Sequence, residues 1–304
     1  MEDCLTVQNL GKSYRHFKAL NGLTMHVPKG AIYGLVGKNG AGKTTLIRLI
    51  CGLQQPTFGE YELYGCSYKS QEITKVRKRM GAVVETPSLY LGMTARENLK
   101  EQYRVLGLPS DEGMEELLTL VGLMDTGKKK VKNFSLGMRQ RLGIAVALCG
   151  DPDFLVLDEP VNGLDPQGII EMRELILKLN RKRQITVLIS SHILDELSRL
   201  ATHYGFIDHG SMIKEISAEE LEEACKKCIR IEVSDLSLLS RVLEEEGLEY
   251  KLLSGNQADI FDSVDITELV QKLAAVGCKV RSITKKDESL ESYYVNLVGG
   301  GEYA

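Results

Sequence analysis

The residues best suited to chemistry form a glycine-rich run, residues 37–42, followed by Lys43 and Thr44. Glycines let a backbone wrap closely, so that its N–H groups and the start of a following helix hold phosphate oxygens. Lys43 is placed to reach terminal phosphates as a point charge, and the Thr44 hydroxyl is placed to ligate Mg²⁺. We therefore predict a phosphate-binding loop made of Gly37, Lys38, Asn39, Gly40, Ala41, Gly42, Lys43, Thr44 and Thr45.

A second chemical signal is the apolar run 154–157, which ends in Asp158 and Glu159. Such a strand places carboxylates at the carboxyl edge of a parallel sheet, where ligands bind in these folds. Asp158 is predicted to hold Mg²⁺, directly or through water, and Glu159 to act as general base toward an attacking water. A strand that runs into an acidic turn is the alternative for this segment taken alone. The nearby phosphate loop favours hydrolysis of a nucleotide.

The elements that must position these groups follow from the apolar pattern. Buried strands are predicted at 31–36, 154–157 and 186–190, and helices at 44–51 and 169–179. Buried strands separated by helices imply an α/β fold with a mainly parallel sheet that is covered on both faces.

The pattern changes after about residue 217. Between residues 228 and 283 the order is strand, helix, strand, strand, helix, strand, which predicts a small α+β ferredoxin-like domain. We therefore predict an ATPase-type domain over residues 3–217 and a small accessory domain over residues 218–304.

Four more segments resemble motifs of the ABC ATPase family. Residues 134–138 (Phe-Ser-Leu-Gly-Met) resemble its signature loop, and residues 162–165 (Asn-Gly-Leu-Asp) resemble its D-loop. Residues 190–192 (Ser-Ser-His) resemble its switch-histidine segment, and Tyr14 resembles the aromatic residue that stacks on adenine. The resemblance covers residues 3–216, with every motif in the family's order.

The resemblance implies an ABC ATPase domain with a mainly parallel sheet and a helical subdomain. It further implies that two such domains close head to tail over two ATP molecules, with Mg²⁺ as the second cofactor. Ser135 and Gly137 of one copy would then face the γ-phosphate held by Lys43 of the other. His192 would contact the γ-phosphate in cis and help to position the water, and Asp165 would organise the opposite site.

Two positions depart from the family's commonest signature, Leu-Ser-Gly-Gly-Gln. Leu136 replaces the first glycine and Met138 replaces the glutamine. Leucine restricts the backbone where glycine does not. Methionine lacks the side-chain amide that could reach a nucleotide across the dimer. We therefore expect closure of two copies that is weaker or that uses main-chain contacts only.

A third departure is Glu85, at a position where most relatives carry glutamine. Glutamate offers a charged oxygen to Mg²⁺ and, when ionised, cannot donate a hydrogen bond. Glu85 and the segment 93–99 resemble the E-loop branch of the family, which is associated with bacteriocin immunity and with bacitracin or lantibiotic resistance. A neutral substitution in a general exporter is the alternative. The predicted metal ligands are Thr44, Glu85 and Asp158.

The composition of the chain restricts which partners it can bind. The 304 residues have a formal net charge of −4, so no nucleic-acid partner is predicted. No apolar run approaches the ~18–20 residues of a membrane span, and the seven scattered cysteines fit a reducing cytosol.

The prediction is a cytoplasmic protein, peripheral on the inner face of the membrane through a separately encoded transmembrane permease, and paired with an identical or related ATPase subunit. As the ATP-hydrolysing motor of a bacterial ABC exporter, it would expel a peptide antibiotic or bacteriocin. The alternatives are a general drug or lipid exporter ATPase, a non-transport ABC ATPase acting on the ribosome or DNA, and a module that binds ATP without turnover. The intact Glu159 and His192 argue against the last.

Overall fold

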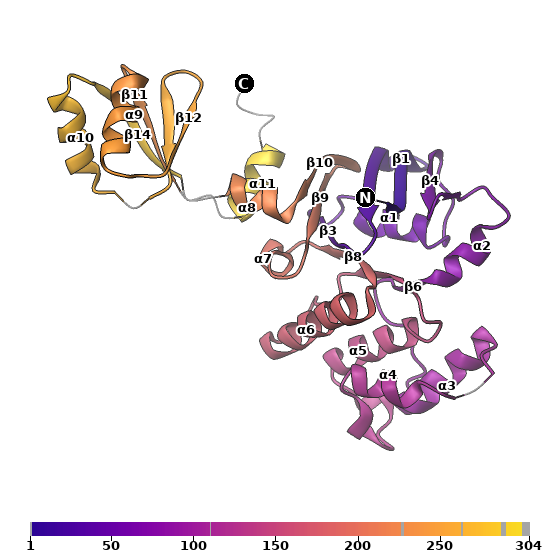
Figure 1. Ribbon diagram of the computed structural model, residues 1–304. Helices are drawn as coiled ribbons and strands as arrows, with labels where there is room; N and C mark the ends of the chain where they lie inside the picture. Colours follow the sequence, from indigo (N-terminus) through magenta and orange to yellow (C-terminus); the bar gives the residue numbers. More distant parts are fainter. Residues whose placement is uncertain (1, 110, 226–227, 263, 287–289, 300–304) are drawn as a thin grey trace. The chain divides into compact units, whose positions relative to one another are not determined.

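The structure is a computed structural model that describes residues 2–109, 111–225, 228–262, 264–286 and 290–299. The chain divides into two compact units, Met1–Ala218 and Glu219–Ala304 (Figure 1).

The first unit is built on a six-stranded sheet of order β10-β9-β3-β8-β7-β6, in which every neighbouring pair except β10 and β9 is parallel. Strands β3, β7 and β8 are buried along their whole length, as predicted for strands covered on both faces. Because these strands are parallel, their carboxyl ends lie at one edge of the sheet. The strands are β3 (Ile32–Val36), β6 (Met80–Val83), β7 (Phe154–Asp158), β8 (Thr186–Ser191), β9 (His203–Asp208) and β10 (Ser211–Ser217).

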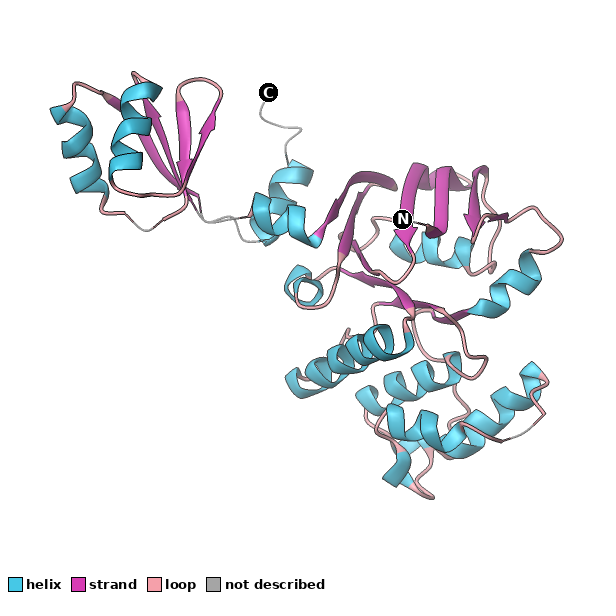
Figure 2. Cartoon of the chain, in the orientation of Figure 1, coloured by secondary structure: helices cyan, strands magenta, loops and turns pink. Residues whose placement is uncertain are grey.

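A second, antiparallel sheet of order β2-β1-β4-β5 lies in the same unit (Figure 2). Helix α1 (Lys43–Ile50) contributes Leu46 and Ile50 to the core that this sheet shares with the parallel sheet. The sequence did not reveal these strands, because bulges along β1 interrupt the alternation of apolar and polar residues. The strands are β1 (Asp3–Tyr14), β2 (Phe17–Pro28), β4 (Phe58–Leu63) and β5 (Cys66–Ser67).

The helical subdomain implied by the resemblance is present as α3, α4 and α5, which pack on one another. Helix starts are marked by side-chain caps: Thr94 and Glu97 form a capping box at α3, Ser135 caps α5 and Asp165 caps α6. The helices are α2 (Ile73–Val76), α3 (Ala95–Leu106), α4 (Met114–Leu120), α5 (Leu136–Ala147), α6 (Pro166–Arg183) and α7 (Leu194–Ser198), with 3₁₀ turns η1 (Arg77–Arg79), η2 (Met124–Thr126) and η3 (Val131–Asn133).

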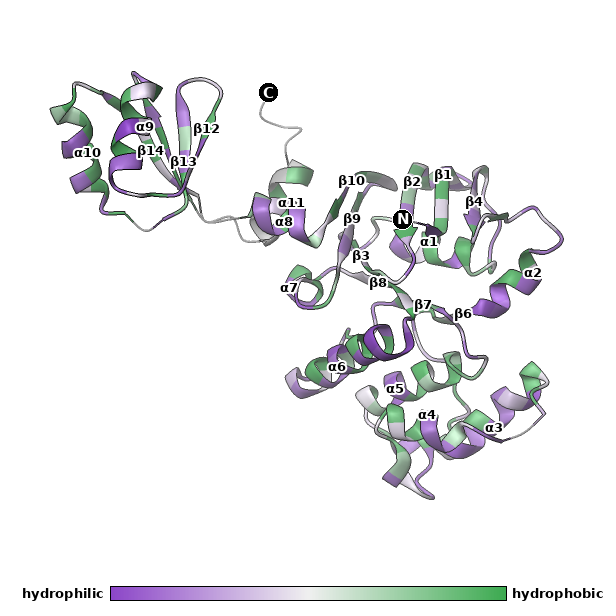
Figure 3. Ribbon diagram, in the orientation of Figure 1, coloured by the Kyte–Doolittle hydropathy of each residue, from purple (hydrophilic) through white to green (hydrophobic). Residues whose placement is uncertain are grey.

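The second unit has an antiparallel sheet of order β12-β13-β11-β14. Helices α9 and α10 carry hydrophobic as well as hydrophilic residues (Figure 3). They bury Leu239 and Leu269 in a core with Ile231 and Ala258 of the sheet. The predicted fold class, a mainly parallel α/β domain followed by a small ferredoxin-like domain, is confirmed. The elements are α8 (Ala218–Ala224), β11 (Cys228–Val233), α9 (Leu236–Glu245), β12 (Tyr250–Leu253), β13 (Gln257–Ile260), α10 (Ile266–Ala275), β14 (Val280–Lys286) and α11 (Leu290–Gly299).

Candidate nucleotide site

The glycine-rich loop joins β3 to α1 at the carboxyl edge of the parallel sheet. Gly42 has a φ of +110°, and a Cβ there would lie 2.7 Å from the carbonyl oxygen of Ala19. Only glycine fits this position without strain. The loop folds back over Lys43, whose buried amino group donates to the carbonyl oxygens of Gly37 (2.6 Å) and Lys38 (3.3 Å). The loop thus fixes a cation at the start of a helix.

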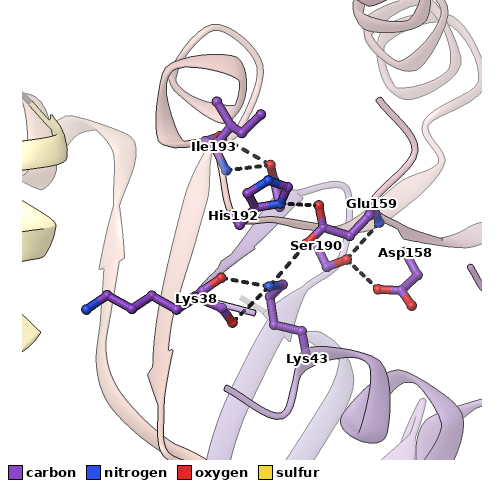
Figure 4. Close-up of polar contacts among 9 residues, drawn as sticks. Lys38, Lys43, Asp158, Glu159, Ser190, His192 and Ile193 are labelled. Carbon is purple, nitrogen blue, oxygen red and sulfur yellow. Dashed lines mark hydrogen bonds and ion pairs between the residues drawn. The ribbon is translucent and has the colours of Figure 1, made fainter. Parts of the chain in front are cut away.

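Glu159 connects this cation to the switch histidine (Figure 4). One carboxylate oxygen of Glu159 lies 3.1 Å from the Lys43 amino group, and the other lies 2.7 Å from Nδ1 of His192. When the carboxylate is ionised it can only accept, and His192 is then the donor in the tautomer that carries its proton on Nδ1. The loop before α1, the end of β7 and the end of β8 therefore meet in one chain of charge-assisted contacts.

Asp158 lies beside this chain and is fully buried. Its Oδ1 accepts a hydrogen bond of 2.7 Å from the Ser190 hydroxyl. Its Oδ2 is buried without a hydrogen-bond partner among the residues that the structure describes. A buried acceptor without a partner is costly. A hard cation or its water shell would satisfy this oxygen, so Asp158 fits the predicted role of a Mg²⁺ ligand.

The backbone of Glu159 is strained. Its φ is +49°, in the left-handed region that non-glycine residues rarely occupy. Two hydrogen bonds hold it there: its N–H donates to the Ser190 hydroxyl oxygen (2.9 Å), and its carbonyl accepts from the N–H of Asn162 (3.2 Å). Strain that surrounding bonds maintain at a polar cluster is a common feature of functional sites.

A cavity of about 250 Å³ opens over the loop. Its aromatic wall is Phe17, which is 60% exposed. Tyr14, predicted from the resemblance to stack on adenine, is absent from the lining; its hydroxyl donates to the Gln54 side chain, and the Lys12 amino group lies 5.2 Å from its ring centre. The lining residues are Phe17, Ala19, Asn39, Gly40, Gly42, Lys43, Thr44, Thr45, Glu159 and Asn162.

Sequence reasoning missed Phe17 and gave Ser190 no role. A signal existed for both. Phe17 is an aromatic residue three positions after Tyr14, at the start of β2. Ser190 lies opposite Asp158 in the parallel register of β7 and β8, which the two strand predictions could have suggested.

Ser135, Gly137 and Asp165 line a separate cavity of about 470 Å³, which shares no lining residue with the first. The Ser135 hydroxyl accepts from the N–H of Met138 (3.2 Å), and Asp165 accepts from the N–H of Gly168 (3.0 Å). One chain therefore holds the predicted residues in two places. The structure joins Lys43 to Glu159 and His192, and it does not join them to the signature residues.

Two leucines pack across glycines in this second cavity. A Cβ on Gly163 would lie 3.2 Å from a methyl group of Leu136. A Cβ on Gly137 would lie 3.7 Å from a methyl group of Leu164. Leu136, which departs from the common signature, thus covers the D-loop glycine of its own chain.

Glu85 lies outside both cavity linings. Its side chain is 57% exposed and accepts a hydrogen bond of 2.6 Å from Arg48, near the end of α1. In this structure the Glu85 carboxylate is therefore paired with Arg48. Over the described parts of the chain, no group of three or more His, Cys, Asp or Glu side chains is arranged to hold a metal ion.

A further carboxyl, Glu196, faces this cluster from α7. Burial raises its pKa above the ordinary value; the charge of His192 opposes that shift and the carboxylate of Glu159 adds to it. Its Oε2 is buried and, within the described residues, has no hydrogen-bond partner.

The fold and this cluster define a class of protein. A phosphate loop at the carboxyl edge of a parallel sheet, with an acceptor for a metal at the end of the neighbouring strand, is the architecture of a P-loop nucleoside triphosphatase.

Comparisons narrow the class to a family. A family model described as ABC transporter matches residues 20–162. The chain is 39% identical to the bacitracin transport ATP-binding protein BcrA of Bacillus licheniformis, over 99% of both chains. It is 43% identical to the lantibiotic transport ATP-binding protein SrtF of Streptococcus pyogenes, over 72% of this chain and 94% of that protein. The chain therefore belongs to the ABC transporter family.

A solved structure supports the same assignment. The ADP conformation of an ATP-binding cassette of an ABC transporter matches with a TM-score of 0.66 and 26% identity, covering 72% of this chain and 93% of that one. The predicted resemblance to the bacitracin and lantibiotic members is confirmed, as are ATP binding and the enzyme class, an ATPase coupled to transport. Among the helices described, none combines the length and apolar character of a membrane span.

Proposed function

We propose that this chain is the ATP-hydrolysing motor of a bacterial exporter that expels a peptide antibiotic or bacteriocin. The observation that carries the proposal is the extent of the similarity. The match to the bacitracin transport protein spans 99% of this chain and so includes both units. The match to the lantibiotic transport protein spans 222 residues, close to the length of the first unit. The similarity to a bacitracin transport protein thus extends through the accessory unit, and a bacitracin-like peptide is the substrate that we propose.

ATP would enter by displacing a carboxylate. In this structure the Lys43 amino group is neutralised by Glu159. The terminal phosphates are stronger ligands for the same cation, because they add the N–H groups of the loop and the start of α1. Their arrival would release Glu159 from Lys43. Glu159 would remain held by His192 and free to accept a proton from the attacking water.

Thr44 and Asp158 would hold Mg²⁺, with the free Oδ2 of Asp158 as the anchor. The ion would neutralise charge that develops on the transferred phosphate. Glu85 is proposed as a third, conditional ligand, because it must first leave Arg48. The ion pair with Arg48 would thus hold Glu85 away from the ion until nucleotide binds.

The partners are proposed on the same basis. The separation of the two cavities supports a head-to-tail pair of ATPase subunits, in which Ser135, Gly137 and Asp165 of one copy complete the Lys43 site of the other. A separately encoded permease would carry the peptide across the membrane and hold the pair at its cytoplasmic face.

Cells that lack the chain provide the test. They would be complemented with the parent, with Glu159→Gln or with Glu85→Gln, and challenged with bacitracin, a lantibiotic and a non-peptide drug. We expect the parent to restore resistance to bacitracin most strongly and Glu159→Gln to restore none. Equal protection against the non-peptide drug would point to a general exporter. Full protection by Glu85→Gln would remove Glu85 as a marker of the peptide branch.

Co-purification distinguishes a transporter subunit from the remaining alternative, an ABC ATPase that acts on the ribosome or DNA. A tagged chain should be recovered from membranes with a permease. Recovery with ribosomes or DNA instead would overturn the transport assignment.

A further inference from the structure

Ser190 is a buried side chain that joins the two acidic residues of the site. Asp158 and Ser190 are paired in the parallel register of β7 and β8. The Ser190 hydroxyl is fully buried, donates to Oδ1 of Asp158 at 2.7 Å, and accepts from the N–H of Glu159 at 2.9 Å (Figure 4). Its proton and one lone pair are therefore both used, each by a different neighbour.

We propose that Ser190 is a positioning residue that sets both the metal ligand and the general base through this one hydroxyl. On the metal side, the bond to Oδ1 fixes the rotation of the Asp158 carboxylate. It leaves Oδ2 as the carboxylate oxygen without a partner among the described residues. The bond thereby determines which oxygen of Asp158 would face Mg²⁺.

On the base side, the hydroxyl holds the left-handed backbone of Glu159. At a φ of +49° that backbone is unfavourable for glutamate, and it persists only if its neighbours enforce it. Loss of the acceptor would leave the N–H unsatisfied and let the backbone relax. The carboxylate would then shift relative to Lys43 and His192, to which it is bonded.

The neighbouring Ser191 provides a matched contrast. It is equally buried, but its hydroxyl bonds only the N–H (2.9 Å) and carbonyl (3.2 Å) of Ile193, within a local turn. The two serines thus have the same size and burial, and only Ser190 touches the acidic residues. Removal of each hydroxyl in turn separates positioning from general stability.

The inference rests on the proposed roles of Asp158 and Glu159, and the experiment uses the full chain. Ser190→Ala, Ser190→Thr, Ser190→Val and Ser191→Ala would be compared with the parent. Three quantities are measured: kcat and KM for ATP, the affinity for a fluorescent ATP analogue with and without Mg²⁺, and the melting temperature.

For Ser190→Ala we expect kcat to fall about tenfold, since misplaced catalytic groups lose rate steeply. The Mg²⁺ concentration for half-maximal nucleotide affinity should rise, and the affinity without Mg²⁺ should stay unchanged. Ser190→Thr keeps a hydroxyl and should restore both quantities, whereas the equally shaped Ser190→Val should not. Ser191→Ala should retain the parent's Mg²⁺ dependence, because the Ser191 hydroxyl bonds Ile193 and neither Asp158 nor Glu159.

Parent-like kcat and Mg²⁺ dependence in Ser190→Ala would overturn the inference. If that variant fails to fold, equal behaviour of the threonine and valine variants would overturn it instead. The proposed function fails separately: a Glu159→Gln chain that hydrolyses ATP at the parent's rate would remove the base itself, whatever Ser190 does.

Discussion

Two cavities of the first unit, the one over the phosphate loop and the one lined by Ser135, Gly137 and Asp165, differ in how their polar groups are arranged. Over the phosphate loop, the Glu159 carboxylate contacts the Lys43 amino group at 3.1 Å and Nδ1 of His192 at 2.7 Å. In the signature cavity, Ser135 and Asp165 are occupied as helix caps, and their apolar neighbours are leucines packed against glycines. The first cavity therefore has charged groups that can act on a phosphate and a water. The second has two helix starts and an apolar surface.

This difference indicates that the two cavities have different roles in ATP hydrolysis. A preformed cluster of charges loses little order when a phosphate replaces one member of the cluster. Helix starts attract an anion but do not by themselves activate water. Hydrolysis should therefore depend most on the first cavity, and the second should matter through another copy of the chain. Mutations at each cavity can test these two expectations.

The largest effect is expected at Glu159. Glu159→Gln keeps the shape of the side chain but removes the base, so the hydrolysis rate should fall by about 10²–10⁴-fold. ATP binding should persist, because Lys43 and the loop are unchanged. Stopped hydrolysis with retained binding of a fluorescent ATP analogue would support the assignment. Glu60→Gln, on the exposed surface of β4, is the matched control and should behave as the parent.

A mixing experiment tests whether the two cavities complete each other in trans. Lys43→Ala and Ser135→Ala should each lower hydrolysis by about 10–100-fold, since each removes a hydrogen bond to a charged group. A mixture of the two variants can form pairs in which one composite site combines an intact Lys43 with an intact Ser135. Activity should therefore rise above that of either variant alone. If mixing restores nothing, the two cavities do not complete each other.

Much of the first cavity could be predicted because its residues are adjacent in sequence or end neighbouring strands. The loop before α1 and the pair Asp158 and Glu159 have fixed spacing and a clear apolar context. The contact of Glu85 with Arg48 could not be predicted, because it joins exposed side chains 37 residues apart. Phe17 was missed for a similar reason: a hairpin decides which of two nearby aromatic residues turns toward the cavity. The bulged antiparallel sheet lacked a regular pattern altogether.

The aromatic wall gives the next prediction. Stacking of a base on an aromatic ring contributes about 1–3 kcal/mol. Because Phe17 lines the cavity and Tyr14 does not, Phe17→Ala should weaken ATP affinity by about tenfold or more. Tyr14→Ala should have a smaller effect, through loss of its bond to Gln54. Titration with ATP and with a triphosphate that lacks a base separates stacking from phosphate binding, and the opposite ranking of the two variants would restore Tyr14 as the adenine platform.

The smallest effect is expected at Leu136, where two interpretations differ in sign. From sequence, a leucine in place of glycine should hinder closure of two copies, so its truncation should strengthen ATP-dependent pairing. In the structure, Leu136 packs over Gly163 and so links the signature loop to the D-loop of its own chain. Truncation should then loosen both loops and weaken pairing.

We expect the second outcome. Leu136 is 42% exposed, so Leu136→Ala should cost about 1 kcal/mol or less in folding stability and lower hydrolysis only a few-fold. Leu252→Ala, at a leucine that is 47% exposed in the second unit, controls for general loss of apolar surface. Pairing would be measured by light scattering with ATP in a Glu159→Gln background. Stronger pairing in the Leu136 variant would show instead that the leucine hinders closure. The cavity lined by Ser135, Gly137 and Asp165 would then limit the pairing of two copies as well as take part in it.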